Sequence, residues 1–94
     1  MERAEGFPGY ATTYHFRVDV MPSRPYLRLE WCIAVIENPL RREVQDDGRI
    51  QFWGLVEEIG EAYPQFRGKV LKVVTLADGV TIHTAYPDRN FRPR

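Results

Sequence analysis

The sequence predicts a single α+β domain, in which one main helix packs on an antiparallel sheet of about four meandering strands, with one further element before the helix. Three observations lead to this prediction. Two β-rich runs flank Asp78-Gly79, residues 26–37 carry apolar side chains at helical spacing, and the turn sequence Asp46-Asp47-Gly48 separates two further strand-like runs. A chain of 94 residues with 44% hydrophobic residues suits one domain with a modest core.

The chain is predicted to begin with a flexible lead-in, residues 1–11, which is followed by a single domain, residues 12–94. The lead-in has glycines and a proline but no apolar periodicity. After it, apolar residues alternate with polar ones, which favours a strand and leaves an amphipathic helix as the alternative. The alternating apolar residues are Tyr14, Phe16, Val18 and Val20. Pro22 and Pro25 are then expected to end any regular element.

Residues 26–37 form the clearest helix in the sequence. Their polar side chains fall on the side opposite to an apolar face. That face consists of Leu29, Cys32, Ile33 and Ile36, widened by Trp31 and Val35. Asn38-Pro39 is expected to end the helix, because asparagine tolerates a left-handed cap position and proline cannot continue the helix.

Two strands are expected next, at residues 43–45 and 50–55. In the second, Ile50 and Phe52 lie on one side, whereas Gln51, Trp53 and Leu55 lie on the other. Residues 57–68 then form a long connection that contains glycines, a proline and several acids. Loops of this length are often functional or ordered by their own side chains.

Residues 69–86 are predicted to form a hairpin around a type I′ turn at Asp78-Gly79, with positive φ at both positions. This turn pairs Leu76 with Thr81, and it sets the register of every later pair. Those pairs are Val74 with His83, Lys72 with Ala85, and Leu71 with Tyr86. The predicted core side carries Leu71, Val73, Thr75, Val80, Ile82, Thr84 and Tyr86, and the opposite side carries Lys72, Val74, Thr81 and His83. Five residues are expected to be buried together: Leu29, Ile33, Ile36, Val73 and Ile82.

The charges are balanced overall but unevenly distributed. Thirteen basic residues match thirteen acidic ones, which argues against a dedicated, strongly electrostatic nucleic-acid binder. Residues 1–66 nevertheless hold seven basic and eleven acidic residues, and residues 67–94 hold six and two. The C-terminal hairpin and tail are therefore the electropositive part of the molecule.

Several functional classes have no support in the sequence. The single cysteine allows no intramolecular disulfide or cysteine-based metal site, and no signal-peptide or membrane-spanning pattern is present. The motifs of nucleotide hydrolases, zinc enzymes and serine esterases are missing as well. We therefore expect a cytoplasmic protein that uses no metal or cofactor and does not contact a membrane.

His83 is the leading candidate for acid–base chemistry, because imidazole exchanges protons near neutral pH. Lys72 shares its face in the predicted register, and Arg89 follows the strand, so two cations could hold a phosphate beside the imidazole. Metal-independent RNA cleavage needs such an arrangement, since a hydroxyl loses a proton, the phosphate gains charge and the leaving oxygen is protonated. The alternative is an ordinary, partly exposed strand histidine beside a lysine that serves solubility and edge protection.

Other residues allow a functional and a structural interpretation. Arg41 and Arg42 could bind phosphates or could interact with the C-terminal end of the helix. Trp53 and Trp31 could stack on bases or belong to the core. His15 is expected to be exposed and could act with His83. The long connection also contains three acidic residues, Glu57, Glu58 and Glu61. They could form a general-base cluster or could simply be solvated.

Several motifs together resemble a family of small, mostly uncharacterised bacterial proteins, over residues 24–91. The family is similar in layout to toxins of the RelE and ParE superfamily, within the barnase, EndoU, colicin and RelE fold group. The matching segments are Arg24-Pro25-Tyr26-Leu27, Glu30-Trp31-Cys32, Asn38-Pro39-Leu40-Arg41, residues 44–50, Trp53-Gly54, residues 73–76, Asp78-Gly79, Ile82-His83 and residues 88–91. The resemblance implies a helix on a curved antiparallel sheet and metal-independent RNA cleavage on the open sheet face.

These observations lead to two functional hypotheses. The first is a toxin-type endoribonuclease of a bacterial toxin–antitoxin-like system, with His83 as acid or base and with Lys72 and Arg89 on the phosphate. Its partners would be RNA and an antitoxin. The second is a non-catalytic module that binds a protein through the open sheet face or an edge strand. A homodimer formed through strand edges is compatible with either hypothesis.

Overall fold

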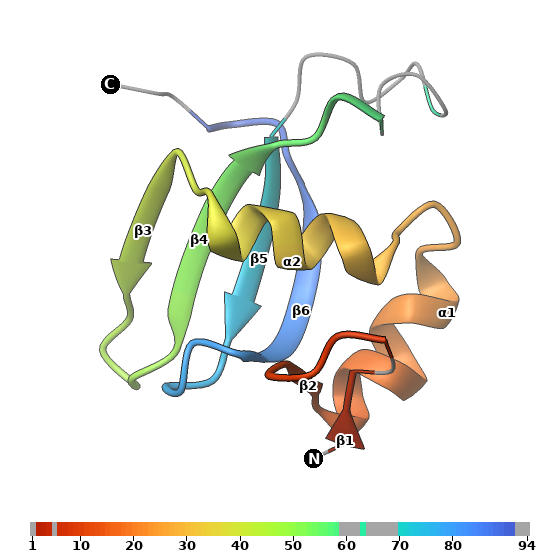
Figure 1. Ribbon diagram of the computed structural model, residues 1–94. Coiled ribbons are helices and arrows are strands. Elements are labelled where there is room, and N and C mark those ends of the chain that lie inside the picture. The colour runs from red at the N-terminus through yellow and green to blue at the C-terminus, as the bar shows by residue number, and fades with distance from the viewer. Residues whose placement is uncertain (1, 5, 59–62, 64–69, 92–94) are drawn as a thin grey trace.

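In the computed structural model, α2 lies across one face of a six-stranded sheet whose strand order is β1-β2-β6-β5-β4-β3 (Figure 1). The structure describes residues 2–4, 6–58, 63 and 70–91. The strands are β1 (Glu2–Arg3), β2 (Ala11–Thr12), β3 (Arg41–Val44), β4 (Ile50–Leu55), β5 (Val70–Thr75) and β6 (Thr81–Asp88). Strands β3 to β6 form an antiparallel meander, whereas β2 runs parallel to β6. The α+β class is confirmed, but the sheet is larger than predicted and it is mixed.

The N-terminal segment belongs to the sheet. The sequence pattern predicts no regular element before residue 12, but β1 pairs with β2, and β2 in turn lies along β6. Ala4 is buried, and the ring of Phe7 packs against the core. These contacts dock the segment against the domain, in place of the expected lead-in.

A helical segment replaces the strand predicted after residue 12. It contains the π-helix η1 (Phe16–Val20) and the short helix α1 (Met21–Ser23). Phe16 and Val20, four residues apart, are 1% and 2% exposed, whereas Tyr14 and Val18 lie on the outside. The alternation was therefore misleading, because only every fourth residue of this run reaches the core. Pro22, which was expected to end any regular element, lies within this helical segment next to its last residue, Ser23.

The predicted main helix is present as α2 (Leu29–Glu37). It begins three residues later than expected, and its C-cap is Asn38, whose φ of −143° is not left-handed. Trp31, Cys32, Ile33 and Val35 are buried, and Leu29 and Ile36 pack against the same core in partly buried positions. Val73 and Ile82 of the sheet are fully buried in that core, so the five residues expected to meet do so.

Strand β4 has its predicted bounds, and β3 begins two residues earlier than expected, so that it includes Arg41 and Arg42. The turn at Asp78-Gly79 differs from the type I′ prediction, since only Gly79 has positive φ. Leu76 accepts a hydrogen bond from the N–H of Gly79, and the Asp78 carboxylate accepts two from the N–H groups of Val80 and Thr81. These bonds close a four-residue loop, residues 77–80. The hydrogen bonds of the Asp78 side chain stabilise this loop, so that a second residue with positive φ is not needed.

A β-bulge in β6 corrects the predicted register of the hairpin. Thr75 pairs with Ile82 as predicted, but Val74 pairs with Thr84, so that His83 is an extra residue without a partner on β5. Beyond the bulge every pair moves by one residue, and Lys72 therefore faces Tyr86 instead of Ala85. Ala85 is fully buried on the core side, whereas Tyr86 and Thr84 lie on the open face, opposite to the prediction.

Helix α2 approaches β4 most closely at Gly54. A Cβ placed on Gly54 would lie 3.0 and 3.1 Å from the two Val35 methyl groups and 3.3 Å from the Val35 Cα. The methyl groups could turn away, but the Cα could move only with the helix backbone. Glycine at this position therefore sets how closely the helix lies on the sheet.

We expect Gly54→Ala to lower the free energy of unfolding by about 1–3 kcal/mol, because the added methyl overpacks the helix–sheet contact. Urea unfolding of a double-mutant cycle with Val35→Ala checks the cause. If the clash with Val35 is responsible, the two losses are less than additive. Strictly additive losses would contradict this explanation.

Candidate functional site

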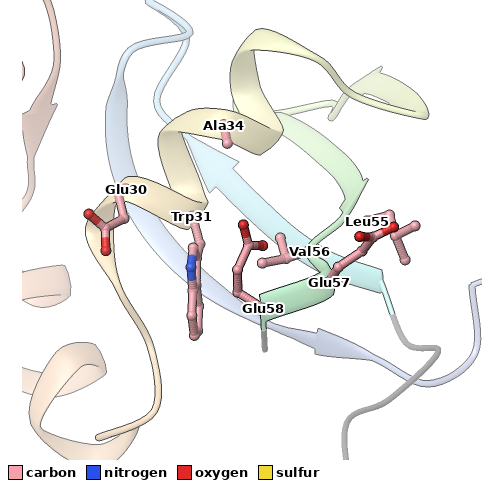
Figure 2. Close-up of a pocket in the computed structure, with 7 residues that line it drawn as sticks. All are labelled: Glu30, Trp31, Ala34, Leu55, Val56, Glu57 and Glu58. Atoms are coloured by element: carbon pink, nitrogen blue, oxygen red, sulfur yellow. The ribbon is translucent and has the colours of Figure 1, made fainter. Parts of the chain in front are cut away.

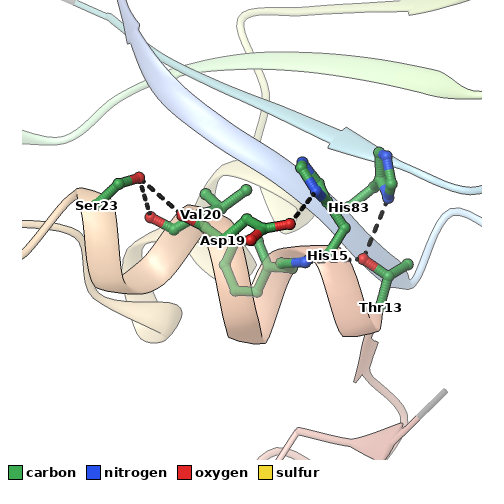
Figure 3. Close-up of polar contacts among 7 residues, drawn as sticks. Thr13, His15, Asp19, Val20, Ser23 and His83 are labelled. Carbon is green, nitrogen blue, oxygen red and sulfur yellow. Dashed lines mark hydrogen bonds and ion pairs between the residues drawn. The ribbon is translucent and has the colours of Figure 1, made fainter.

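The two histidines of the chain lie together at the edge of the sheet, where the helical segment meets β6 (Figure 3). The ring centroids of His15 and His83 are 4.8 Å apart, and the rings are tilted by 33°. His15 comes from the start of the helical segment, and His83 is the extra residue of the bulge. We call these two side chains the imidazole pair.

Each imidazole is oriented through its Nδ1 atom. Nδ1 of His83 lies 3.1 Å from the Thr13 hydroxyl oxygen, which also accepts a hydrogen bond from the Phe16 N–H. Nδ1 of His15 lies 3.1 Å from the Asp19 carboxylate, one helical turn further along. Among the described residues, neither Nε2 atom makes a hydrogen bond.

The bulge determines which way His83 points. Ile82 and Ala85, on either side of the bulge, are both fully buried on the helix-covered side of the sheet. His83 and Thr84 are partly exposed between them, and both face away from the core. The open face therefore still carries both His83 and Lys72, as the sequence predicts, although their relative positions have changed.

Burial lowers the pKa of His83 from its ordinary value of 6.5, and electrostatic interaction with Arg49 and His15 lowers this pKa further. His83 is thus a neutral imidazole at neutral pH. An imidazole in this state can accept a proton from a hydroxyl group.

Four side chains form a row across the open face, one from each strand of the meander. Arg41, Trp53, Lys72 and Tyr86 are directly paired from β3 to β6. The Lys72 ammonium lies 5.2 Å from the centroid of the Trp53 ring and 5.5 Å from that of Tyr86. The Arg41 guanidinium lies 5.8 Å from the Trp53 centroid. We call this set the cation–aromatic row, and it holds two positive charges over aromatic rings.

Trp53 anchors this row and is not itself an exposed platform. Its side chain is nearly buried, and its indole N–H donates a 2.8 Å hydrogen bond to the Asp88 carboxylate. Because Trp53 is only 6% exposed, little of its ring is open to stack on a base, the role that the sequence suggested. Within the described part of the chain, Lys72 makes no ion pair with a carboxylate, so its charge is available to an anion.

The remaining candidates lie elsewhere. Arg89 is exposed in the turn after β6, six residues from His83, or about 20 Å along an extended strand. Arg42 is paired with Phe52 on the other side of β3, away from the cation–aromatic row. Trp31 is buried at α2, and Glu61 lies outside the described residues, as does most of the connection at 57–68. The structure therefore does not bring Arg89 or Arg42 to His83.

Other reactive groups have no comparable setting. Burial raises the pKa of the Cys32 thiol to about 12, so this cysteine is not a nucleophilic thiolate at neutral pH. Within residues 2–4, 6–58, 63 and 70–91, no group of three metal-binding side chains could hold a metal ion. No helix in these ranges is long and apolar enough to cross a membrane.

Thr13 and Asp19 are site residues that the sequence analysis missed. The spacing of His15 and Asp19 places both on one helix face, and it would have indicated their contact if the segment had been recognised as helical. Nothing in the sequence indicates the contact of Thr13 with His83, because it depends on β2 lying parallel to β6.

Comparison with known proteins adds no assignment: no family model matches the chain, and no similar curated protein or solved structure was found.

The lowered pKa of His83 predicts how stability depends on pH. Above pH 6.5 His83 is neutral in both states, whereas below it the unfolded chain takes up a proton more readily than the folded one. The free energy of unfolding should therefore fall as the pH is lowered through 6.5 toward the folded-state pKa. Urea unfolding between about pH 5.5 and 7.5 measures this slope, which His83→Gln should flatten. An unchanged slope in that variant would show that another group is responsible.

Proposed function

We propose that the protein is a metal-independent endoribonuclease with a RelE-like arrangement of helix and sheet, and that the imidazole pair performs its acid–base chemistry. One observation carries the proposal. The two histidines, which lie far apart in the sequence, are 4.8 Å apart in space, and each is fixed through Nδ1. The resemblance to RelE-like toxins supports the same activity, and it implies a role in a bacterial toxin–antitoxin-like system.

In the proposed reaction, Nε2 of neutral His83 removes the proton of a ribose 2′-hydroxyl while that oxygen attacks the adjacent phosphorus. The bond from phosphorus to the 5′ oxygen breaks, and protonated His15 donates its Nε2 proton to the departing oxygen. The products are a 2′,3′-cyclic phosphate and a 5′-hydroxyl. His83 ends the step protonated and His15 ends it neutral, and exchange with water resets both.

The contacts of the two imidazoles suit these different roles. Thr13 can accept the Nδ1 proton of His83, which leaves a lone pair on Nε2 for the base. The Asp19 carboxylate is a counter-ion for His15 in its protonated state.

The cation–aromatic row would bind the RNA strand beside the reacting phosphate. Tyr86 lies three positions after His83 in β6, which corresponds to about 10 Å along the strand. Lys72 and Arg41 are thus better placed for a neighbouring phosphate than for the reacting one. Lys72 accordingly acts in substrate binding in this proposal, and Arg89 has no role in the chemical step.

We expect His83→Ala and His15→Ala each to lower kcat/KM for a short RNA by about 100-fold or more, as loss of one general acid or base does. The assay follows the 2′,3′-cyclic phosphate product with EDTA present. Thr84→Ala, a change in the same bulge, should retain activity within about threefold. Activity that is unaffected by both histidine substitutions would refute the proposed site, and absence of cleavage by the wild type would favour the interaction-module hypothesis.

Lys72→Met should weaken binding of an uncleavable 2′-deoxy oligonucleotide. It should also reduce the slope of log K against log salt concentration by about the amount that one phosphate contact contributes. Fluorescence anisotropy at several salt concentrations measures both effects. Arg89→Met is the matched control, since it removes one positive charge outside the row. Equal effects of the two substitutions would indicate a diffuse charge effect instead of a defined contact.

A further inference from the structure

Strand β3 leaves one edge of the sheet open. It is the outermost strand on its side of the sheet, and among the described strands it pairs with β4 alone (Figure 1). Arg42, Glu43 and Val44 are all exposed on it. Val44 is 60% exposed, although it is paired with the buried Ile50. An edge of this kind can be extended by a strand from another molecule.

The hydrogen bonding of the β3–β4 hairpin shows which backbone groups of β3 point outward. The N–H of Gln45 donates a 2.7 Å hydrogen bond to the Arg49 carbonyl, so the backbone of Gln45 is directed toward β4. In an antiparallel pair, residues that bond to one neighbouring strand alternate with residues that face the other side. Glu43 is therefore directed inward like Gln45, whereas Arg42 and Val44 present their N–H and C=O groups to the open edge.

Antiparallel pairing of β3 with a second copy of itself has few possible registers. A twofold symmetric pair places one residue opposite its own copy at the axis, and β3 has four residues. An axis at Arg41 or Arg42 opposes two arginines, and an axis at Glu43 opposes two glutamates, which is destabilising. An axis at Val44 opposes two valines, and the backbone of Val44 also faces the edge. Charge and hydrogen bonding thus favour the same axis.

The charges on either side of Val44 complement each other in this register. Two arginines precede Val44 and two aspartates follow it at equal distances, so each arginine lies opposite an aspartate of the second copy. The opposed residues are Arg42 with Asp46 and Arg41 with Asp47, and Glu43 lies opposite Gln45. The aspartates lie in the turn after β3 and would contribute their side chains only. Within the described part of the chain, neither Arg42 nor Asp46 forms an ion pair.

From these observations we infer that β3 pairs with β3 of a second copy of the chain, antiparallel and centred on Val44, to form a twofold symmetric dimer. The chain has a formal net charge of zero, so overall repulsion does not keep two copies apart. The twofold axis is perpendicular to the sheet, and both open faces therefore lie on the same side of one continuous sheet. This dimer does not depend on RNA cleavage, because the β3 contact and the imidazole pair share no residue.

Sedimentation velocity of the full chain at several concentrations tests the pairing. We expect a dissociation constant of about 1–100 μM, because the contact is short. Val44→Lys places two lysines opposite each other at the axis and should weaken the dimer by about tenfold or more. Leu55→Lys is the matched control, since Leu55 is 55% exposed but lies on β4. It should leave the dissociation constant within about twofold of the wild-type value.

Charge reversal tests the register. Arg42→Glu and Asp46→Arg should each weaken the dimer by about tenfold, because each places like charges opposite each other at both symmetric positions. The combined variant Arg42→Glu/Asp46→Arg restores opposite charges, and its dissociation constant should return to within about threefold of the wild-type value. No recovery in the combined variant would overturn the pairing centred on Val44.

Two other results would overturn the proposal as a whole. One is a dimer that Val44→Lys leaves unaffected, because the contact would then lie elsewhere on the molecule. The other is a wild-type chain that stays monomeric up to about 1 mM, because the open edge would then be left for a strand of a different protein.

Discussion

The arrangement of the whole molecule depends on the close packing of α2 against β4 at Gly54. With no side chain on Gly54, the Val35 methyl groups reach the sheet, and the helix lies flat over the strands of the meander. This contact seals one face of the sheet over a continuous core that extends from Phe16 to Ala85. The opposite face is not covered by α2. Arg41 and Lys72 lie on it, and the imidazole pair lies at its edge beside β6.

Within this frame, one extra residue in β6 organises the open face. The bulge leaves His83 without a cross-strand partner, so that its side chain meets Thr13 and His15 beyond the sheet edge. The same shift places Tyr86 opposite Lys72 and completes the cation–aromatic row. The imidazole pair and the row are thus two consequences of a single irregularity. Bulges often re-aim side chains in this way next to functional sites.

The two faces of the molecule also differ in charge. Arg41 and Lys72 lie on the open sheet face, whereas Glu30, Glu37, Glu57 and Glu58 line hollows beside α2, one of which is shown in Figure 2. The balanced total charge therefore combines a positively charged patch on the open sheet face with negatively charged side chains beside α2.

The sequence by itself determined the elements whose signals are local. Short-range backbone and packing preferences are enough to predict the helix at residues 29–37, the strand at 50–55 and the glycine-containing turns of both hairpins. Only the tertiary structure decided the helical state of residues 14–23, since a run with apolar residues at every second position can bury either one strand face or every fourth residue of a helix. The tertiary structure also decided the bulge at His83 and the contacts of His83 with Thr13 and His15. These features depend on the packing of β2 and η1 beside β6. Because the packed segments are far apart in the chain, the contacts leave no local sequence pattern.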